Sequence, residues 1–154
     1  MEIKLDQTDL KLLNLIQENS KRPIKELAAR LDLSIGPVHE RLKKLEKLQL
    51  IKKYVALIDF EKAGKQLTNY CQVSLSKHST KAFEDFEDFV KNRDEILECS
   101  YVSGDHDYLL KIVSSNVAEY QNFITKELSS LNMIGKINSL FVMKYVKYKT
   151  SIKL

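Results

Sequence analysis

Residues 23–51, PIKELAARLDLSIGPVHERLKKLEKLQLI, contain two helical patterns separated by a turn. Pro23 suits the first turn of a helix, where its missing N–H costs no hydrogen bond, and apolar residues then recur at helical spacing. Ser34 is a favourable N-cap for a second helix. The apolar positions of that helix fall at i, i+4 and i+7, namely Val38, Leu42 and Leu45. The stretch therefore predicts two helices joined by a tight turn at residues 32 and 33.

The side of the second helix opposite this apolar stripe is small at its start and basic toward its end. At 100° per residue it carries Gly36, Glu40, Lys43, Lys44 and Lys47, with His39 at its border. Small residues allow close approach to base edges, and cations further along meet phosphates. A lysine-rich outer face alone is typical of a solvated helix, but the preceding helix and capped turn favour a helix-turn-helix DNA reader. We predict DNA contacts from Ser34, Ile35, Gly36, Pro37, His39, Glu40, Arg41, Lys43, Lys44 and Lys47.

Positive charge is unevenly distributed along the 154 residues, whose formal net charge is +4. Residues 1–58 contain 12 Lys and Arg against 8 acids, whereas residues 59–154 contain 13 of each sign. The whole excess therefore accompanies the predicted reader, as a polyanionic partner requires. A membrane surface would also attract it, but no lipidation signal or long apolar run supports that partner.

The first residues and the cysteines indicate a reducing compartment. MEIKLDQTD has no apolar signal-peptide segment, so we expect a cytoplasmic protein. Cys71 and Cys99 lie in apolar, strand-like runs without CxxC spacing, which predicts buried free thiols rather than a disulfide or a metal pair. We expect no cofactor.

The rest of the chain predicts an α+β organisation. A first helix, capped by Asp6 or Thr8 and running to about residue 19, completes a three-helix unit. YVALIDF, residues 54–60, is β-rich and leads into a linker around Gly64. We predict a DNA-binding domain at 1–52, a linker at 53–67 and a second domain at 68–154.

That second domain shows the order β-α-β-β-α-β. Strands are predicted at 69–76, 96–102, 108–113 and from about 136 through 149, and helices at 80–90 and 117–131. This is the ferredoxin-like arrangement, four antiparallel strands with both helices on one face. Apolar residues occupy both sides of the third strand, at Leu109, Leu110, Ile112 and Val113. A second copy of the chain is therefore expected to cover the open face.

Two segments give the chain a family resemblance. LDQTDLKLLNLIQENSKRPIKELAARLDLS at 5–34 and VSGDHDYLLK at 102–111 resemble the Lrp/AsnC transcriptional regulators, the second segment in particular the leucine-responsive branch. The resemblance covers essentially the whole chain. It implies a winged-helix-like helix-turn-helix domain, a β-linker, and a ferredoxin-like regulatory domain that forms dimers and commonly octamers. It also implies amino-acid effectors that bind between dimers and alter assembly and DNA binding.

The resemblance matches Gly104 and Asp107 to the family's effector loop, with two departures elsewhere. Gln49 stands where a glycine often closes the reading helix, which predicts a longer or less sharply turned end. Asn132-Met133-Ile134 stands where Pro-Gly-Val is common, which leaves room for a different amino-acid preference. Leucine and methionine are the first candidates.

The loop chemistry suits such a ligand independently. Asp105 or Asp107 offers acceptors for an ammonium, N–H groups of a glycine-containing turn offer donors for a carboxylate, and nearby apolar side chains offer a recess. Without the resemblance, Ser-Gly-Asp-His-Asp is first of all a plain hairpin loop. We predict effector contacts from Val102, Ser103, Gly104, Asp105, Asp107, Tyr108, Met133 and Ile134.

Two other function classes stay open at this point. Ferredoxin-like sheets also host enzymes, but His39, His78 and His106 are scattered, and no Ser/His/Asp order, glycine-rich phosphate loop or HExxH is present. His106 with its neighbouring aspartates is a weak metal candidate. A ligand-sensing module that acts on protein partners without touching DNA is the third class, and the capped basic helix argues against it.

Overall fold

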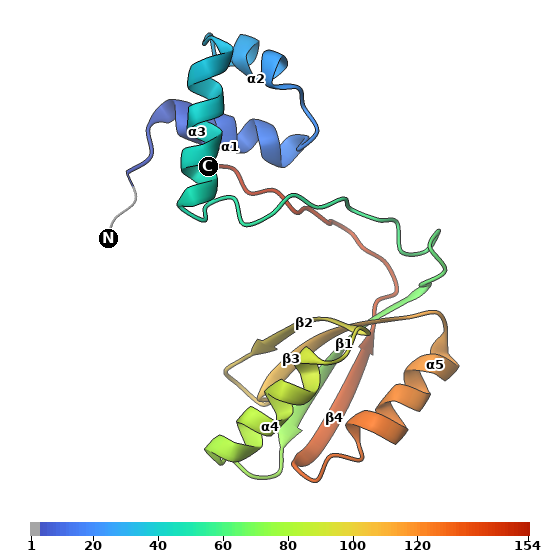
Figure 1. The fold of residues 1–154 in the computed structure, drawn as a ribbon. Helices are drawn as coiled ribbons and strands as arrows, with labels where there is room; N and C mark the ends of the chain where they lie inside the picture. Colours follow the sequence, from blue (N-terminus) through green and yellow to red (C-terminus); the bar gives the residue numbers. More distant parts are fainter. Residues whose placement is uncertain (1–3) are drawn as a thin grey trace. The chain divides into compact units, whose positions relative to one another are not determined.

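The computed structural model describes residues 4–154 and contains two compact units. The helical unit comprises the chain up to Leu57 together with Val146–Leu154, and the sheet unit comprises Ile58–Tyr145 (Figure 1). Residues 1–3, the start of the predicted DNA-binding domain, lie outside the described residues. From the sequence we expect the last nine residues in the second domain, whereas in the structure they group with the helices.

Three helices build the helical unit: α1 (Gln7–Glu18), α2 (Ile24–Arg30) and α3 (Ile35–Lys47). Asp6 caps α1 as predicted, since its Oδ1 accepts from the N–H of Asp9 at 2.7 Å. One apolar side of each helix faces the shared core, which holds Leu12, Leu13, Ile16, Leu27, Ala28, Val38 and Leu45. The predicted two-helix unit and its third helix are therefore present.

The ends of α3 differ from expectation in two respects. Ser34 occupies the N-cap position, but its side chain makes no capping hydrogen bond. Gln49 has φ 57°, the left-handed conformation that glycine adopts most easily, and the N–H of Leu50 donates back to the Leu45 carbonyl at 3.1 Å. The helix therefore ends sharply at Lys47 without a glycine, where we expect a longer or less sharply turned end.

A buried carboxylate joins α1 to α3. The Asp9 side chain is fully buried and accepts from Arg41 Nη1 at 2.6 Å and from Lys44 Nζ at 2.8 Å. Arg41 Nη1 also lies 2.6 Å from Asp6 Oδ2. Burial alone would raise the pKa of Asp9, but hydrogen bonds from Lys44, Arg41 and the Asp6 amide hold that pKa below its usual value. These ion pairs fix how α3 is turned against α1.

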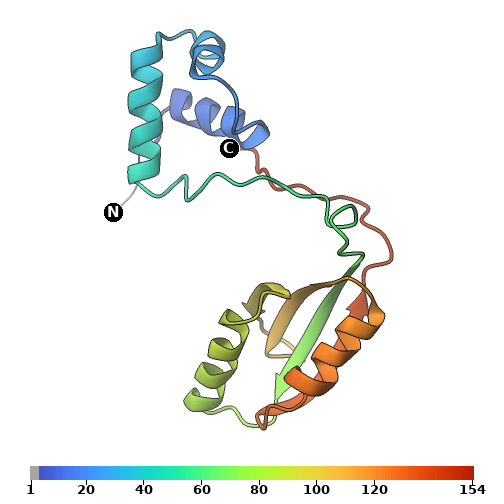
Figure 2. The same ribbon diagram turned by 45° about the vertical axis from the view of Figure 1, so that its right-hand side comes forward.

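The sheet unit has the order β1 (Leu67–Leu75), α4 (Thr80–Lys91), β2 (Ile96–Tyr101), β3 (Tyr108–Ser114), α5 (Val117–Asn122), a π-helical continuation (Phe123–Leu128) and β4 (Ile134–Phe141). The strands are antiparallel in the order β2-β3-β1-β4. Both helices cover one face, as Figure 2 shows. This is the predicted ferredoxin-like fold.

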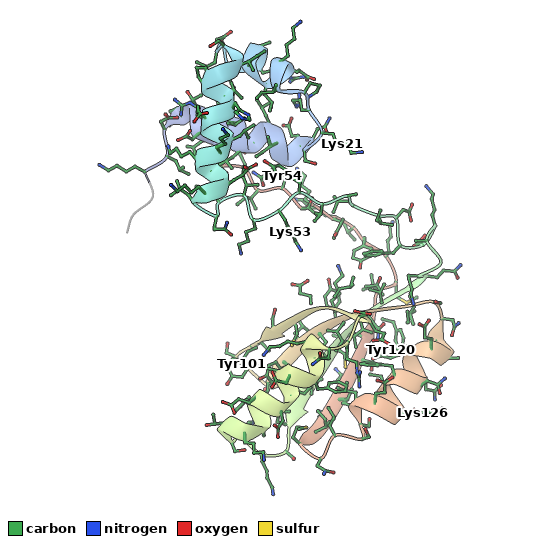
Figure 3. The ribbon with its side chains drawn as sticks, in the orientation of Figure 1. Lys21, Lys53, Tyr54, Tyr101, Tyr120 and Lys126 are labelled. Carbon is green, nitrogen blue, oxygen red and sulfur yellow. The ribbon has the colours of Figure 1, made fainter. Side chains whose placement is uncertain are left out.

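The core of the sheet unit lies between that face and the helices. Its buried side chains include Cys71, Val73, Phe86, Leu110, Ile112, Phe123 and Leu128. Tyr120 of α5, labelled in Figure 3, donates its hydroxyl to Ser139 of β4 at 2.5 Å and so fastens this helix to the outer strand. On the opposite face of β3 Leu109 is half-buried, whereas Val113 is 5% exposed and so already buried within this chain. Cover of this face by a second copy stays a prediction.

The last strand is shorter than predicted, and the β-rich run at 54–60, expected in the linker, forms no strand. Within residues 4–154, neither 54–60 nor 142–149 forms a strand, and β4 ends at Phe141. A strand needs a neighbouring strand for its N–H and C=O groups, and these segments have no such neighbour in the described chain.

The two cysteines are free thiols, as predicted. Cys71 is buried and Cys99 is half-buried, and burial raises the pKa of each to about 11. Nowhere in the described chain is a helix long and apolar enough to cross a membrane.

Replacing Asp9 by Asn should destabilise the helical unit by about 3 kcal/mol, the low end for a broken buried ion pair, because Arg41 keeps Asp6. Since the folded pKa of Asp9 lies below the unfolded one, its contribution is present above pH 4 and lost as the pH falls through the folded value. Denaturant unfolding at pH 7 and pH 3 measures both. A D9N variant as stable as wild type at pH 7 would contradict the network's role.

Candidate DNA interface and effector site

The outer face of α3 is open to solvent where the sequence predicts DNA contacts. Nine of the ten predicted residues are exposed: Ser34, Ile35, Gly36, Pro37, His39, Glu40, Lys43, Lys44 and Lys47. The tenth, Arg41, is half-buried because it pairs with the two aspartates of α1. The helix thus presents an exposed face with Ser34, the apolar Ile35 and Gly36 at its start and lysines at its end.

The start of this surface is shaped for close approach. A Cβ added at Gly36 would meet no atom within 4 Å, so packing within the described chain does not require glycine there. Ile35 is 49% exposed although it is large and apolar. The Ser34 side chain is exposed and makes no capping hydrogen bond. These three positions can therefore meet base edges or sugar–phosphate.

The cations of α3 divide into two groups. Arg41 and Lys44 bind Asp9, so part of their charge is neutralised inside the protein. Lys43 is 60% exposed and pairs only loosely with Glu40 at 3.6 Å. Lys47 is exposed in the last turn of the helix. Lys43 and Lys47 are consequently the two lysines of α3 best placed for phosphates.

Further polar groups follow α3 directly. Tyr54 donates its hydroxyl to Glu46 Oε1 at 2.8 Å, and burial with this bond raises the pKa of Tyr54 to about 12. The bond holds the segment after α3 against the helix, and Lys53 beside Tyr54 is exposed (Figure 3). The helical pattern ends before these residues, so the sequence does not predict their role.

The predicted effector loop is organised by Asp107. Its Oδ2 accepts from the Leu75 N–H at 2.7 Å, and its carboxylate lies 3.0 and 3.1 Å from His78 Nε2. Its carbonyl accepts from the N–H of Val102 at 2.9 Å. Burial acts to raise the pKa of Asp107, but the Leu75 N–H and His78 lower it below the usual value. An ionised carboxylate therefore stands at this end of the sheet.

The two segments predicted to form the effector site, the loop before β3 and the turn before β4, both contact the end of β1. Asp107 binds Leu75, and the next residue, Ser76, donates its N–H and its hydroxyl to the Met133 carbonyl at 2.8 and 3.2 Å. Since β1 lies between β3 and β4, the loop before β3 and the turn before β4 flank it. The structure thereby brings Asp107, Met133 and Ile134 to one end of the sheet.

The remaining loop residues are mostly accessible, with one exception. Ser103, Gly104 and Asp105 are exposed, and Gly104 has φ 127°, which suits glycine. Tyr108, by contrast, is 1% exposed, and its hydroxyl donates to Glu87 of α4 at 3.0 Å. Its side chain belongs to the core because it shares the helix-facing side of β3 with Leu110.

His78 is the residue of this site that the sequence does not identify. It reaches Asp107 from the chain between β1 and α4, and its ring stacks on Phe83 with centroids 5.9 Å apart. Tyr101 of β2, labelled in Figure 3, meets the same Phe83 edge-on at 5.6 Å. Among residues 4–154 no three His, Cys, Asp or Glu side chains are grouped to hold a metal ion.

Two family models match the chain. A winged helix-turn-helix DNA-binding model covers residues 5–52, and the Lrp/AsnC ligand-binding domain model covers residues 68–152. Among similar proteins, a leucine-responsive regulatory protein of Haemophilus influenzae is 36% identical over 143 residues, 93% of this chain and 86% of the relative. A proline dehydrogenase transcriptional activator of Rhodobacter capsulatus is 33% identical over 150 residues, 97% of each chain.

Solved structures agree with these matches. A transcriptional regulator of Neisseria meningitidis in complex with L-methionine has a TM-score of 0.93 and 34% identity, with 97% of this chain and 96% of that chain covered. An AsnC family regulator of Agrobacterium tumefaciens has a TM-score of 0.90 and 31% identity, with 96% of each chain covered. The chain therefore belongs to the Lrp/AsnC family of transcriptional regulators.

Proposed function

We propose that this protein binds a specific DNA site through α3 and that leucine or methionine, bound at the end of β1, changes its DNA affinity. It is a regulator of transcription rather than an enzyme, as its family is. In this proposal residues 1–52 read DNA, 53–67 link, and 68–154 sense the effector, with the tail at 146–154 returning to the helical unit. The exposed face of α3 from Gly36 to Lys47 is the observation that carries it.

The DNA half of the proposal uses two kinds of contact. Ser34, Ile35 and Gly36 approach base edges in the major groove, and Lys43 and Lys47 neutralise phosphates. The Asp9 ion pairs keep the helix in its orientation before DNA arrives, so little ordering is needed on binding. A cytoplasmic location follows from this proposed partner.

Two copies of the chain would read an imperfect palindrome, and we propose a homodimer that assembles further, to an octamer. Apolar side chains left exposed along the linker support association: Tyr54, Val55, Leu57 and Ile58 are 49–64% exposed. Residues 59–154 contain equal numbers of acidic and basic residues, so a net charge does not oppose association of two copies.

The effector half of the proposal rests on the ionised Asp107 and its neighbours. Asp107 and the exposed Asp105 can accept from an ammonium group, and N–H groups around Gly104 can donate to a carboxylate. Met133 and Ile134 line the apolar side. The methionine complex of the Neisseria relative and the name of the Haemophilus relative support methionine and leucine as the two probes.

For amino-acid binding to change DNA binding, the amino acid need only bind one arrangement of the chain more tightly than another. If the DNA-competent and DNA-incompetent arrangements differ in their affinity for the amino acid, ligand binding shifts their populations. By linkage, DNA then changes the affinity for the amino acid by the same factor. Whether target genes are activated or repressed depends on where the site lies, not on this chemistry.

Replacing Lys43 by Ala should lower the slope of log affinity against log salt by about one, because one phosphate contact is lost. A matched substitution of Lys62, which is 86% exposed in the sheet unit, should leave the slope unchanged. Binding titrations to an operator fragment between about 50 and 200 mM salt measure both. A wild-type slope near zero would remove the DNA proposal.

Replacing Gly36 by Leu should weaken DNA binding at least tenfold while thermal stability holds or rises. Leucine fills open space and favours the helix over glycine by about 0.8 kcal/mol, but its bulk blocks close approach to the groove. Fluorescence anisotropy measures the affinity for DNA, and a thermal melt measures the stability. Unchanged affinity would place the groove contact elsewhere.

Leucine or methionine should raise the melting temperature when each of the twenty amino acids is tested at millimolar concentration. At a hundred times Kd the stabilisation is about 2.7 kcal/mol. Asp107→Asn should abolish the shift, and Asp88→Asn, an exposed carboxylate on α4, should keep it. The effector proposal is falsified if no amino acid shifts the wild-type transition.

A further inference from the structure

The C-terminal tail is held on α1 by two side-chain amides. Asn14 Nδ2 donates to the main-chain oxygen of Leu154 at 3.1 Å and Asn14 Oδ1 accepts the Leu154 N–H at 3.2 Å. Gln17 Nε2 donates to the Ile152 carbonyl at 3.1 Å, and Gln17 Oε1 accepts the Ile152 N–H at 3.0 Å. Each amide therefore satisfies both backbone groups of one residue, as a neighbouring strand would.

The spacing of these residues makes the pair a docking surface for extended chain. Asn14 and Gln17 are three apart on one side of a helix, which places their Cβ atoms about 5–6 Å from each other. Ile152 and Leu154 are two apart in an extended segment, a repeat of about 6.6 Å, and the longer Gln side chain takes up the difference. A helical or compact tail could not present two such backbone pairs to this face.

The tail borders an apolar hollow beside α1. A cavity of about 820 Å³ is lined by Leu13 and Ile16 of α1, by residues 50–57, and by Thr150, Ile152 and Leu154. All of these belong to the helical unit. Figure 1 shows the tail, in red, ending near α1. Ile152 remains 68% exposed and the four hydrogen bonds face solvent, so water competes for them and docking is reversible.

The docking helix is also the helix that positions the reader. Asp9 lies one and a half turns before Asn14 on α1 and binds Arg41 and Lys44 of α3. A change at Asn14 and Gln17 therefore acts on the element that fixes the orientation of α3.

The same tail is the direct continuation of β4. That strand begins at Ile134, in the proposed effector turn, and ends at Phe141, from which residues 142–145 lead to the tail. We propose that docking of residues 150–154 on Asn14 and Gln17 carries the effector response from this turn to the DNA-reading helix. Docked and released tails are the two states that the amino acid biases. This inference rests on the proposed function and adds its route of regulation.

The test compares DNA affinity with and without methionine or leucine in the full-length protein. The double variant Asn14→Ala/Gln17→Ala holds the tail released, so it should bind DNA with one and the same affinity whether or not the effector is present. Its effector response, the ratio of the two affinities, should fall to near one. Lys11→Ala, an exposed substitution on the same helix, should keep the wild-type ratio.

A second variant and a direct measurement of tail docking distinguish loss of docking from misfolding of the double variant. A chain ending at Lys149 should lose the response like the double variant. In wild type, the amides of Ile152 and Leu154 should exchange with solvent at least tenfold more slowly than in the double variant, as hydrogen-bonded amides do.

Each contrary result has its own meaning. A full effector response in the double variant, or equally fast exchange of the two amides in wild type, overturns the tail proposal alone. A wild-type protein that binds DNA but responds to no amino acid removes the effector proposal, and the tail's regulatory role falls with it. The exchange measurement then still decides whether the tail docks.

Discussion

The buried carboxylate of Asp9 is the interaction on which the arrangement of the reader depends. An ionised group taken out of water is tolerated only with close, well-oriented partners, and here both partners come from α3 at 2.6 and 2.8 Å. Because Arg41 and Lys44 both bind this carboxylate of α1, the ion pairs favour the observed rotation of α3. That rotation directs Gly36, Lys43 and Lys47 outward. The ion pairs and the apolar stripe thus select the same exposed face.

A carboxylate with close partners also organises the end of the sheet where we propose that the effector binds. Asp107 binds a backbone N–H of β1 and the ring of His78, so the loop before β3 is held while one carboxylate stays ionised. The turn before β4 is attached to the next residue of β1. A ligand bound here would contact the starts of two strands at once. One of them, β4, continues into the segment that returns to the helical unit.

Periodicity explains which parts of this molecule could be predicted from its sequence. The apolar spacings of 3.6 and 2 locate every helix and all four strands of the sheet, and with them the outer face of α3. Tyr108 could also have been placed correctly, since it alternates with Leu110 and Ile112 on the helix-facing side.

Interactions between distant residues could not be predicted in this way. Asp9 and Arg41 are 32 residues apart, His78 and Asp107 are 29 apart, and Asn14 and Leu154 are 140 apart. No local pattern encodes such pairs. For the same reason the sequence predicts a last strand that continues through 149, although β4 ends at Phe141: propensity is local, whereas the pairing partner that a strand needs is not.

The central claim is that DNA covers the outward face of α3, and chemical protection of lysines tests it most directly. The protein is acetylated with and without an operator fragment, and the modification of each lysine is measured by mass spectrometry. The account predicts that DNA protects Lys43 and Lys47 while Lys62 and Lys91, exposed in the sheet unit, react as before. Equal reactivity of Lys43 and Lys47 in the presence and absence of bound DNA would contradict it.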